Sequence, residues 1–241
     1  PIPFQVEKND SVVPAGRNLK IPVISNIYKT YSSFRLFLDL SPSETSAVVV
    51  NSGRVDYSDS LLREDFANFK MWLNNKRSEL QTNINGLLGE INEEYEQYET
   101  IIENGKVNVL LYEKRNRSPI PFSRMSFGSI KLFFLAALLL DKNPPPLICL
   151  EEPDSGFHPD AVSMLAKLLI EASARTTLVV TTHSDILIDA LSERPQSVII
   201  CERNENATEM KRLDADDLKK WMDEYSLGQL WIDGHFGGNR W

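Results

Sequence analysis

Cysteine, positive charge and long apolar runs are all scarce in this sequence, and each shortage argues against a class of protein. The two cysteines, Cys149 and Cys201, lie in apolar, strand-like runs, so we expect buried thiols in a reducing compartment rather than a disulfide framework. The formal net charge of -8 argues against nucleic-acid binding through a broad basic surface, although a local basic patch stays compatible with it. A cytoplasmic protein is therefore expected.

No apolar run approaches the roughly 18 to 20 residues that a membrane span needs. The longest candidate, LFFLAALLL at 132–140, is too short and predicts a buried helix. The first residues show no charged-then-apolar signal pattern, and the chain begins at Pro1 without a methionine, which indicates a processed or a cut start. We expect no membrane partner.

The apolar pattern divides the chain into four segments. Residues 1–62, with runs such as IPVIS and SFRLFLDL between turn residues, predict strands and loops. Residues 63–104 carry apolar residues at three- and four-residue spacing, which predicts an amphipathic helical segment with an acidic outer face and a break near Gly86. Residues 105–213 form the core, and residues 214–241 predict a helical tail.

The core segment alternates strand-like runs with helix-like runs, which is the rhythm of a parallel sheet covered by helices. The helices are expected to begin near Gly128, at Pro159 and after Ser184. This order predicts an α/β fold. The expected strands are KVNVLLYEK (106–114), LICL (147–150), TLVVTT (177–182), SVIICE (197–202) and an edge strand around EMKRL (209–213).

Three stretches fall where an α/β sheet places its ligands, at the carboxyl ends of strands or the start of a helix. Glu151 and Glu152 follow LICL, and His183 follows the strand TLVVTT. The third stretch, SFGSIK at 126–131, is a small polar turn that opens an apolar helix. Backbone amides at such a helix start favour an anion, and phosphate is one.

These residue types suit phosphoryl chemistry. A carboxylate at a strand end can hold Mg²⁺ through water, and a second one beside it can polarise the water that attacks a phosphoryl group. Glu151 and Glu152 supply the adjacent pair, and His183 can hydrogen-bond a terminal phosphate. Taken singly, each stretch has an ordinary alternative: a charge pair at a strand end, a helix cap at Ser184, or a turn. Their order within residues 126–183 favours nucleotide hydrolysis.

The order SFGSIK, then LICLEEP with DSGFHPD, then VVTTHS, resembles the C-terminal half of the ABC-type ATPase domains of the SMC and RecF kind. It is most similar to the bacterial AAA-family ATPases of that group, which often end in a phrase like the EYSLGQLWIDGHFGGNRW found here. The resemblance runs from about Ser123 to Trp241 and, more loosely, from Phe34 to Asn116. It implies a P-loop NTPase-like fold, with a mostly parallel sheet flanked by helices and residues 63–104 as a helical insertion.

The resemblance assigns the catalytic residues. Glu151 matches the family's metal-side acid, here for Mg²⁺, and Glu152 matches the general base that activates water. His183 matches the switch histidine near the γ-phosphate of ATP. Many ABC proteins have aspartate at the first acid, so Glu151, longer by a methylene group, departs from the commoner pattern.

The resemblance also implies a dimer. Ser126, Gly128 and Lys131 match signature residues, which in this family contact the ATP that the other subunit holds. Asp154 and Ser155 match the D-loop, which crosses a dimer interface. Two ATP molecules would then lie between two protomers. The wording SFGS replaces the commoner SDGT or SGGE of the signature.

The phosphate-binding loop of such ATPases is missing. No G-x-x-x-x-G-K-[ST] occurs, and the single Gly-Lys pair, Gly105 and Lys106, has Thr100 where the first glycine belongs. We therefore expect the C-terminal lobe of a longer ATPase, which alone binds ATP poorly or not at all. The P-loop would come from an N-terminal ATPase half.

Three hypotheses remain open. The first is the catalytic lobe of an ATPase that dimerises on ATP and acts in DNA repair or phage defence, with DNA as a candidate partner of the full-length protein. The second is a non-hydrolysing module for dimerisation or partner docking that uses the acidic segment 63–104. The third, a metal-dependent nuclease built on Glu151 and Glu152, is weaker, because the sequence offers no further acid cluster at metal-ligand spacing.

Overall fold

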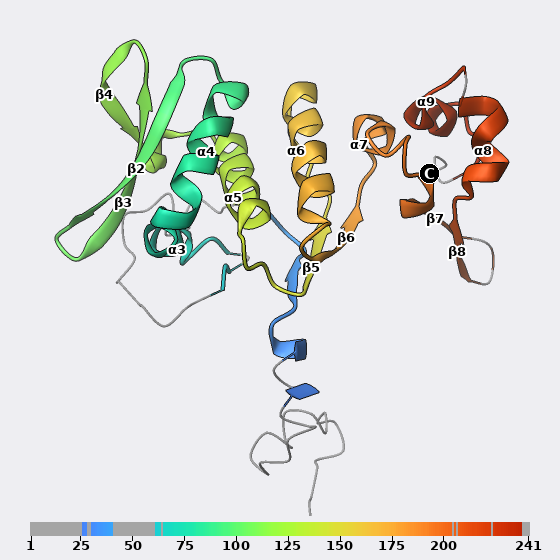
Figure 1. Cartoon of the computed structure of the whole chain (residues 1–241), viewed down its shortest axis with the longest axis horizontal. Helices are drawn as coiled ribbons and strands as arrows, with labels where there is room; N and C mark the ends of the chain where they lie inside the picture. Colours follow the sequence, from blue (N-terminus) through green and yellow to red (C-terminus); the bar gives the residue numbers. More distant parts are fainter. Residues whose placement is uncertain are drawn as a thin grey trace, which may run out of the picture.

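The structure is a computed structural model that describes residues 26–27, 30–40, 61–63, 65–203, 205, 207–222 and 224–237. The strand expected at IPVIS and the last four residues lie outside these ranges. The described elements form three groups: a parallel sheet with its helices in the centre, an antiparallel sheet with two helices on one side, and a C-terminal group on the other (Figure 1).

The parallel sheet confirms the expected fold class. It contains β1 (Arg35–Phe37), β5 (Leu147–Glu151) and β6 (Thr177–Thr181) in the order β1-β5-β6. All pairs are parallel, and Leu36, Cys149 and Val179 stand in one row across the three strands. The strand expected at 197–202 does not join this sheet.

Three helices accompany the parallel sheet as the sequence predicts: α5 (Phe127–Leu140) precedes β5, α6 (Pro159–Ala172) follows β5, and α7 (Asp185–Asp189) follows β6. The apolar run 132–140 is buried throughout and lies inside α5, which confirms the expected buried helix. Pro159 occupies the first position of α6, where its missing N–H has no intrahelical partner to lose. In Figure 1 α5 and α6 lie on one side of β5.

The two faces of the parallel sheet differ sharply in burial. Phe37 and Leu150 point to the helices and are 0% and 1% exposed. Leu36 and Val179, on the opposite face, are 52% and 50% exposed, and Cys149 between them is only half-buried. We call the row Leu36, Cys149 and Val179 the open face.

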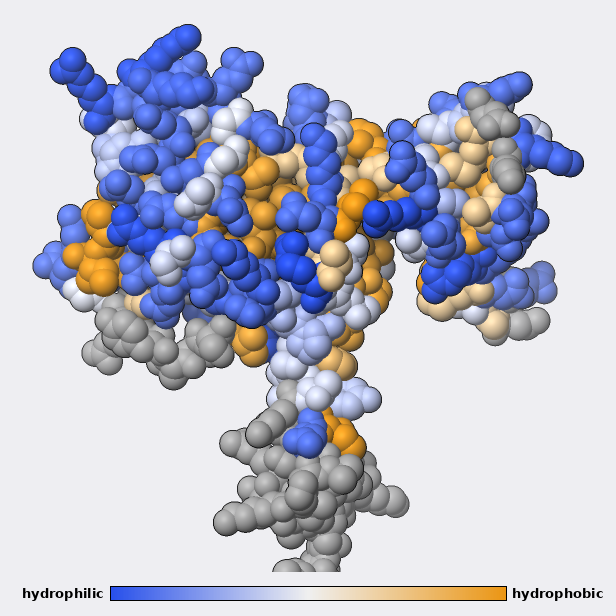
Figure 2. Space-filling model, in the orientation of Figure 1, coloured by the Kyte–Doolittle hydropathy of each residue, from blue (hydrophilic) through white to orange (hydrophobic). Residues whose placement is uncertain are grey.

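Hydrophobic surface is also visible over the central helices, whereas the antiparallel sheet and the C-terminal group are mainly hydrophilic (Figure 2).

The segment 63–104 is not helical throughout, which corrects the expectation from its spacing. Helices α3 (Phe69–Asn75) and α4 (Arg77–Ile91) are separated at Lys76, and α4 runs through Gly86 without a break. The rest of the segment is a strand. It belongs to an antiparallel sheet of β2 (Tyr95–Glu103), β3 (Lys106–Glu113) and β4 (Asn116–Pro121), in that order.

A tight turn at Asn104 and Gly105 joins β2 to β3. Both residues have positive φ, 50° and 71°, which is the backbone of the favoured two-residue hairpin turn. Tyr98 and Val109 on these strands face α3, α4 and α5 and are buried in the main core. A second antiparallel connection then leads from β3 into β4.

The C-terminal group has a small core of its own. Strands β7 (Ile199–Arg203) and β8 (Thr208–Arg212) form an antiparallel ribbon, and helices α8 (Ala215–Met222) and α9 (Leu227–Ile232) complete the group. The buried residues of this core are Ile188, Ile200, Leu213, Leu218, Leu227, Leu230 and Trp231.

The two cysteines are free, but they are not the buried thiols expected from the sequence. Cys149 is half-buried on the open face of the sheet, and Cys201 is exposed on β7. Cys149 stands in the partly exposed row with Leu36 and Val179, and on β7 only Ile200 is buried. Among the described residues, no helix combines the length and the apolar character needed to cross a membrane.

Candidate active site

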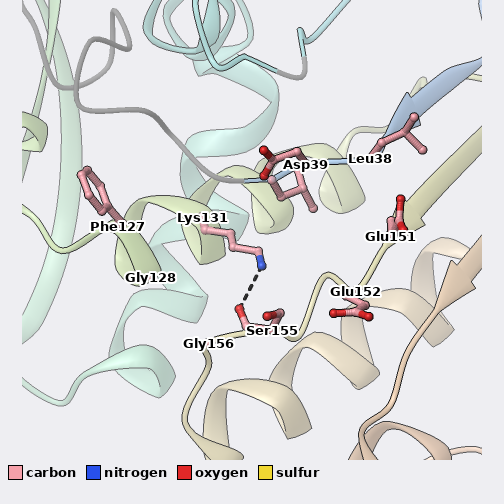
Figure 3. A pocket seen from close by; sticks show the side chains of 10 residues that line it. Leu38, Asp39, Phe127, Gly128, Lys131, Glu151, Glu152, Ser155 and Gly156 are labelled. Carbon is pink, nitrogen blue, oxygen red and sulfur yellow. Dashed lines mark hydrogen bonds between the residues drawn. The ribbon is translucent and has the colours of Figure 1, made fainter. Parts of the chain in front are cut away.

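Two adjacent glutamates stand at the carboxyl end of β5, the central strand of the parallel sheet. Glu151 is the last residue of the strand and Glu152 is the first residue after it, and both are exposed. Glu152 has a φ of 40°, a left-handed conformation uncommon for residues other than glycine. The two carboxylates point in different directions (Figure 3).

The neighbouring strand β6 holds the backbone of Glu152 in place. The Glu152 N–H donates to the carbonyl oxygen of Thr181 at 3.0 Å and to its hydroxyl oxygen at 3.2 Å. Thr181 is the last residue of β6, so these bonds tie the two strand ends together. A left-handed residue persists only where its surroundings fix it, and Thr181 provides that restraint.

His183 follows β6 by two residues and faces Glu152. Its Nε2 lies 3.7 Å from Glu152 Oε1, and both side chains are about half exposed. Thr182 anchors the loop between them, because its Oγ1 donates to Asp154 Oδ1 at 2.8 Å and accepts from the Ser184 N–H at 2.9 Å. The loop after β5 and the loop after β6 are thus joined by Asp154 as well as by Glu152.

The first turn of α5 contains the predicted signature residues. Ser126 is the N-cap of the helix, and its Oγ accepts from the Ser129 N–H at 3.1 Å. A Cβ built on Gly128 would meet no heavy atom within 4 Å, so the helix start is open on that side. The neighbouring Phe127 side chain is exposed.

Lys131, one turn into α5, reaches across to the loop after β5. Its Nζ donates to the Ser155 carbonyl oxygen at 3.0 Å (Figure 3). The same Nζ lies 5.1 Å from the centre of the Phe157 ring. Burial lowers the pKa of Lys131 below its usual value, and the nearby carboxylates of Asp154, Asp39 and Glu152 oppose that shift. Lys131 therefore binds the predicted D-loop of its own chain.

These groups surround a cavity of about 490 Å³, within the range of small-molecule sites. Its wall combines the start of α5, the loop after β5 and the residues directly after β1 (Figure 3). Among the lining residues are Asp39, Gly128, Lys131, Glu151, Glu152 and Ser155.

The chemistry of the donors fits one kind of metal site. Among the described residues, no three or more His, Cys, Asp or Glu side chains gather to hold a metal ion. Mg²⁺ is usually bound by one or two carboxylates together with waters and substrate phosphates, so a single exposed carboxylate at a strand end suits it. Glu151 is an exposed carboxylate at the end of such a strand.

The structure brings together most of the residues that the sequence singles out. Gly128, Lys131, Glu151, Glu152 and Ser155 line the cavity.

His183 and Asp154 stand beside the cavity through their contacts with Glu152 and Thr182. Ser126 caps α5 instead of lining the cavity.

Sequence reasoning misses three contributors to the site. Asp39 lines the cavity, Thr181 fixes Glu152, and Phe157 lies under the Lys131 ammonium group. Asp39 had a usable signal, because it directly follows the apolar run of β1 in the way that Glu151 ends β5. No sequence signal marks the other two.

The class of fold follows from comparison with solved structures. The Smc head bound to the C-winged helix domain of ScpA superposes with a TM-score of 0.57 at 16% identity, over 82% of this chain and 63% of that one. The Smc head domain with an extended coiled coil, bound to the C-terminal domain of ScpA and derived from Pyrococcus furiosus, gives 0.50 at 15% identity, over 88% and 50%. This chain thus has the P-loop NTPase fold of SMC ATPase heads, and it spans about two thirds and half of the lengths of these two.

The family is narrower than the fold. A family model described as "AAA domain, putative AbiEii toxin, Type IV TA system" matches residues 3–189, which is most of the chain. The chain belongs to this family of AAA domains, which confirms the expected AAA-family relationship, and its likeness to SMC heads is one of fold. No curated protein matches the chain.

Proposed function

We propose that this chain is the C-terminal catalytic lobe of an SMC/RecF-like ABC-type ATPase that hydrolyses ATP. The observation that carries the proposal is the meeting of Glu152 and His183 at the carboxyl ends of neighbouring parallel strands, 3.7 Å apart. Ligands of open α/β sheets bind at this edge. A carboxylate and an imidazole that share such a position suit a water-activating base and a phosphate-binding donor.

Glu152 is the general base of the proposed reaction. It accepts a proton from the attacking water, and its position depends on the two hydrogen bonds that Thr181 makes to its backbone. The left-handed turn at Glu152 separates its carboxylate from that of Glu151, so the two neighbours act on different atoms. Glu151 would hold Mg²⁺, which would supply neutralisation of the charge on the phosphates. His183 donates a hydrogen bond to the terminal phosphate.

The P-loop comes from an N-terminal ATPase half that covers the open face. Parallel sheets are normally covered on both sides, yet Leu36 and Val179 are half exposed here. Among the described strands, none pairs with the edge of β6 that lies away from β5. Glu151 follows Cys149 by two residues and so stands on the same open face. A half that covers this face therefore reaches the metal-side carboxylate.

The signature acts on a second subunit. Open space around Gly128 and the exposed Phe127 leave the start of α5 accessible to an ATP held by another protomer. Ser126 and Lys131 lie in the same turn region, and Asp154 and Ser155 follow β5 close by. The proposed assembly is a homodimer with two ATP molecules between protomers, which acts in DNA repair or phage defence.

ATP turnover tests the assignment. The full-length protein, or this chain combined with its P-loop half, is measured with Glu152→Gln and with Glu90→Gln, an exposed glutamate on α4, as the matched control. We expect Glu152→Gln to lower kcat by about 10² to 10⁴, the usual contribution of a general base, and to trap an ATP-bound dimer. Unchanged turnover in Glu152→Gln would show that Glu152 is not the base.

A further inference from the structure

Helix α7, which follows His183 directly, lies between the two hydrophobic cores of the molecule. Leu187 is buried in the main core, and its neighbour Ile188 is buried in the C-terminal core. The helix has only five residues, and it packs against both cores. The direction in which His183 leaves β6 therefore depends on the C-terminal core as well as on the sheet.

Helix α9 packs on α7 at very short range. A Cβ built on Gly228 would lie 2.5 Å from the carbonyl oxygen of Asp185 and 3.0 Å from the Cβ of Asp189, so a side chain at this position forces the helices apart. Asp185 is the first residue of α7 and stands two positions after His183. A glycine is required here by the contact with α7.

Two hydrogen bonds reinforce the contact. The Gly228 N–H donates to Asp189 Oδ1 at 3.2 Å, and the Leu227 N–H donates to Ser192 Oγ at 3.1 Å. Leu227 itself is fully buried, and Leu230 on the same helix is too. The acceptors at the end of α7 thus satisfy backbone donors that the first turn of a helix leaves without intrahelical partners.

We propose that Gly228 is a positioning residue for His183: the close packing of α9 on α7 holds the imidazole opposite Glu152. The C-terminal group then sets the geometry of the active site although none of its residues lines the cavity. The consequence for turnover rests on the proposed ATPase function, whereas the positioning itself does not. The contacts of Thr182 with Asp154 and Ser184 hold His183 from the sheet side, and the experiment separates the two anchors.

The chain has three histidines, which makes imidazole NMR a direct test. His183 reports on the site. His235, whose ring stacks on Trp221 at a centroid distance of 4.8 Å, reports on the tail, and His158 before α6 reports on the remainder. In Gly228→Ala we expect the signals of His183 and His235 to shift while that of His158 stays. Gly89→Ala on α4, where a Cβ meets nothing within 4 Å, should move none of the three.

Two results would overturn the proposal. If His235 shifts and His183 does not, the sheet side alone positions the imidazole. If neither shifts, Gly228 is not needed for the packing. Should Gly228→Ala fail to fold, Asp189→Ala removes only the acceptor of the Gly228 N–H and introduces no clash, and the same shift of His183 is expected from it.

Turnover gives a second readout in the full-length protein. Gly228→Ala should lower kcat by about tenfold to a hundredfold, because a displacement on the order of 1 Å is enough for that, and leave KM for ATP unchanged. A change in KM with constant kcat contradicts a positioning role. If the unaltered protein does not hydrolyse ATP, the proposed function fails, and the NMR result still decides the positioning of His183.

Discussion

The Lys131 ammonium group lies 3.0 Å from the carbonyl oxygen of Ser155 and stacks on the ring of Phe157. One side chain thereby connects the first turns of α5 to the loop that follows β5. Since an ammonium group donates up to three hydrogen bonds and a buried one loses hydration, this contact compensates part of the cost of burial. The loop after β5 is therefore expected to depend on Lys131 for its order.

Replacing Lys131 with methionine keeps the apolar stem and removes the donor. We expect the backbone amides of Ser155 and Phe157, which close turns onto Glu152 and Asp154, to exchange with deuterium at least several-fold faster. Lys167→Met, at an exposed position of α6, is the control and should leave both amides unchanged. Equal exchange in the two variants would mean that the loop is ordered without Lys131.

The left-handed backbone of Glu152 predicts that replacing this residue with glycine keeps or raises stability and abolishes activity. A non-glycine residue with this φ costs about 1 kcal/mol or more, and glycine does not. The side-chain contact with His183 is half exposed and contributes little. Glu152→Gly should therefore unfold in urea at least as late as the unaltered chain, while turnover of the full protein is lost. Glu151→Gly, in a strand, should lower the free energy of unfolding by about 0.5 to 1 kcal/mol; the reverse order would argue against strain at Glu152.

The open face predicts two different outcomes for neighbouring valines of β6. Val179→Lys lies on the open face and should change the free energy of unfolding by less than about 0.5 kcal/mol, but weaken binding of the P-loop half at least tenfold. Val180→Lys points to the main core and should destabilise the chain by several kcal/mol. Urea unfolding and titration calorimetry measure the two effects. Unimpaired binding by Val179→Lys would place the P-loop half elsewhere.

A buried lysine on α3 predicts a pH dependence of stability. Burial lowers the pKa of Lys70 to about 8 from an ordinary value near 10.5. Below pH 8 the amine is protonated in both states, and burial of its charge destabilises the folded state. As the pH rises from 8 to 10.5 the folded state releases its proton first, so this loss of stability is relieved.

Lys70→Met tests that dependence. It should raise the free energy of unfolding at pH 7 by about 1 to 3 kcal/mol, and the gain should shrink at pH 10. Lys106→Met, at an exposed position of β3, is the control and should show no such pH dependence. A gain that is equal at both pH values would rule out relief of a buried charge as its cause.

The sequence predicts the helices and strands of the central sheet well, because each signal there is local. Short apolar runs bounded by turns give β5 and β6, and Pro159 and Ser184 mark the starts of α6 and α7. The segment after Ile91 shows where this fails. Tyr95, Tyr98 and Ile102 have helical spacing, but Tyr98 and Thr100 are buried on one face of a strand. The Asn104-Gly105 turn was the competing signal, since it favours a strand on both of its sides.

Local sequence signals do not predict which sheet a strand joins. The run 197–202 has the composition of a parallel-sheet strand, yet it pairs antiparallel with β8 because the C-terminal core places it there. The strand β1, at Arg35–Phe37, takes the place beside β5 instead. Strand pairing likewise decides which residues approach Glu152. Thr181 reaches the Glu152 backbone because β5 and β6 are in register at Glu151 and Thr181.

The open face also concerns how the protein is made in a cell. A lobe that displays Leu36 and Val179, and in which no described strand pairs with the outer edge of β6, has the features of an aggregation-prone folding intermediate. Its yield in soluble form should therefore rise when the proposed P-loop half is synthesised alongside it. Under the proposed function, assembly begins during biosynthesis, and a cell that makes one half in excess leaves that excess to chaperones and proteases.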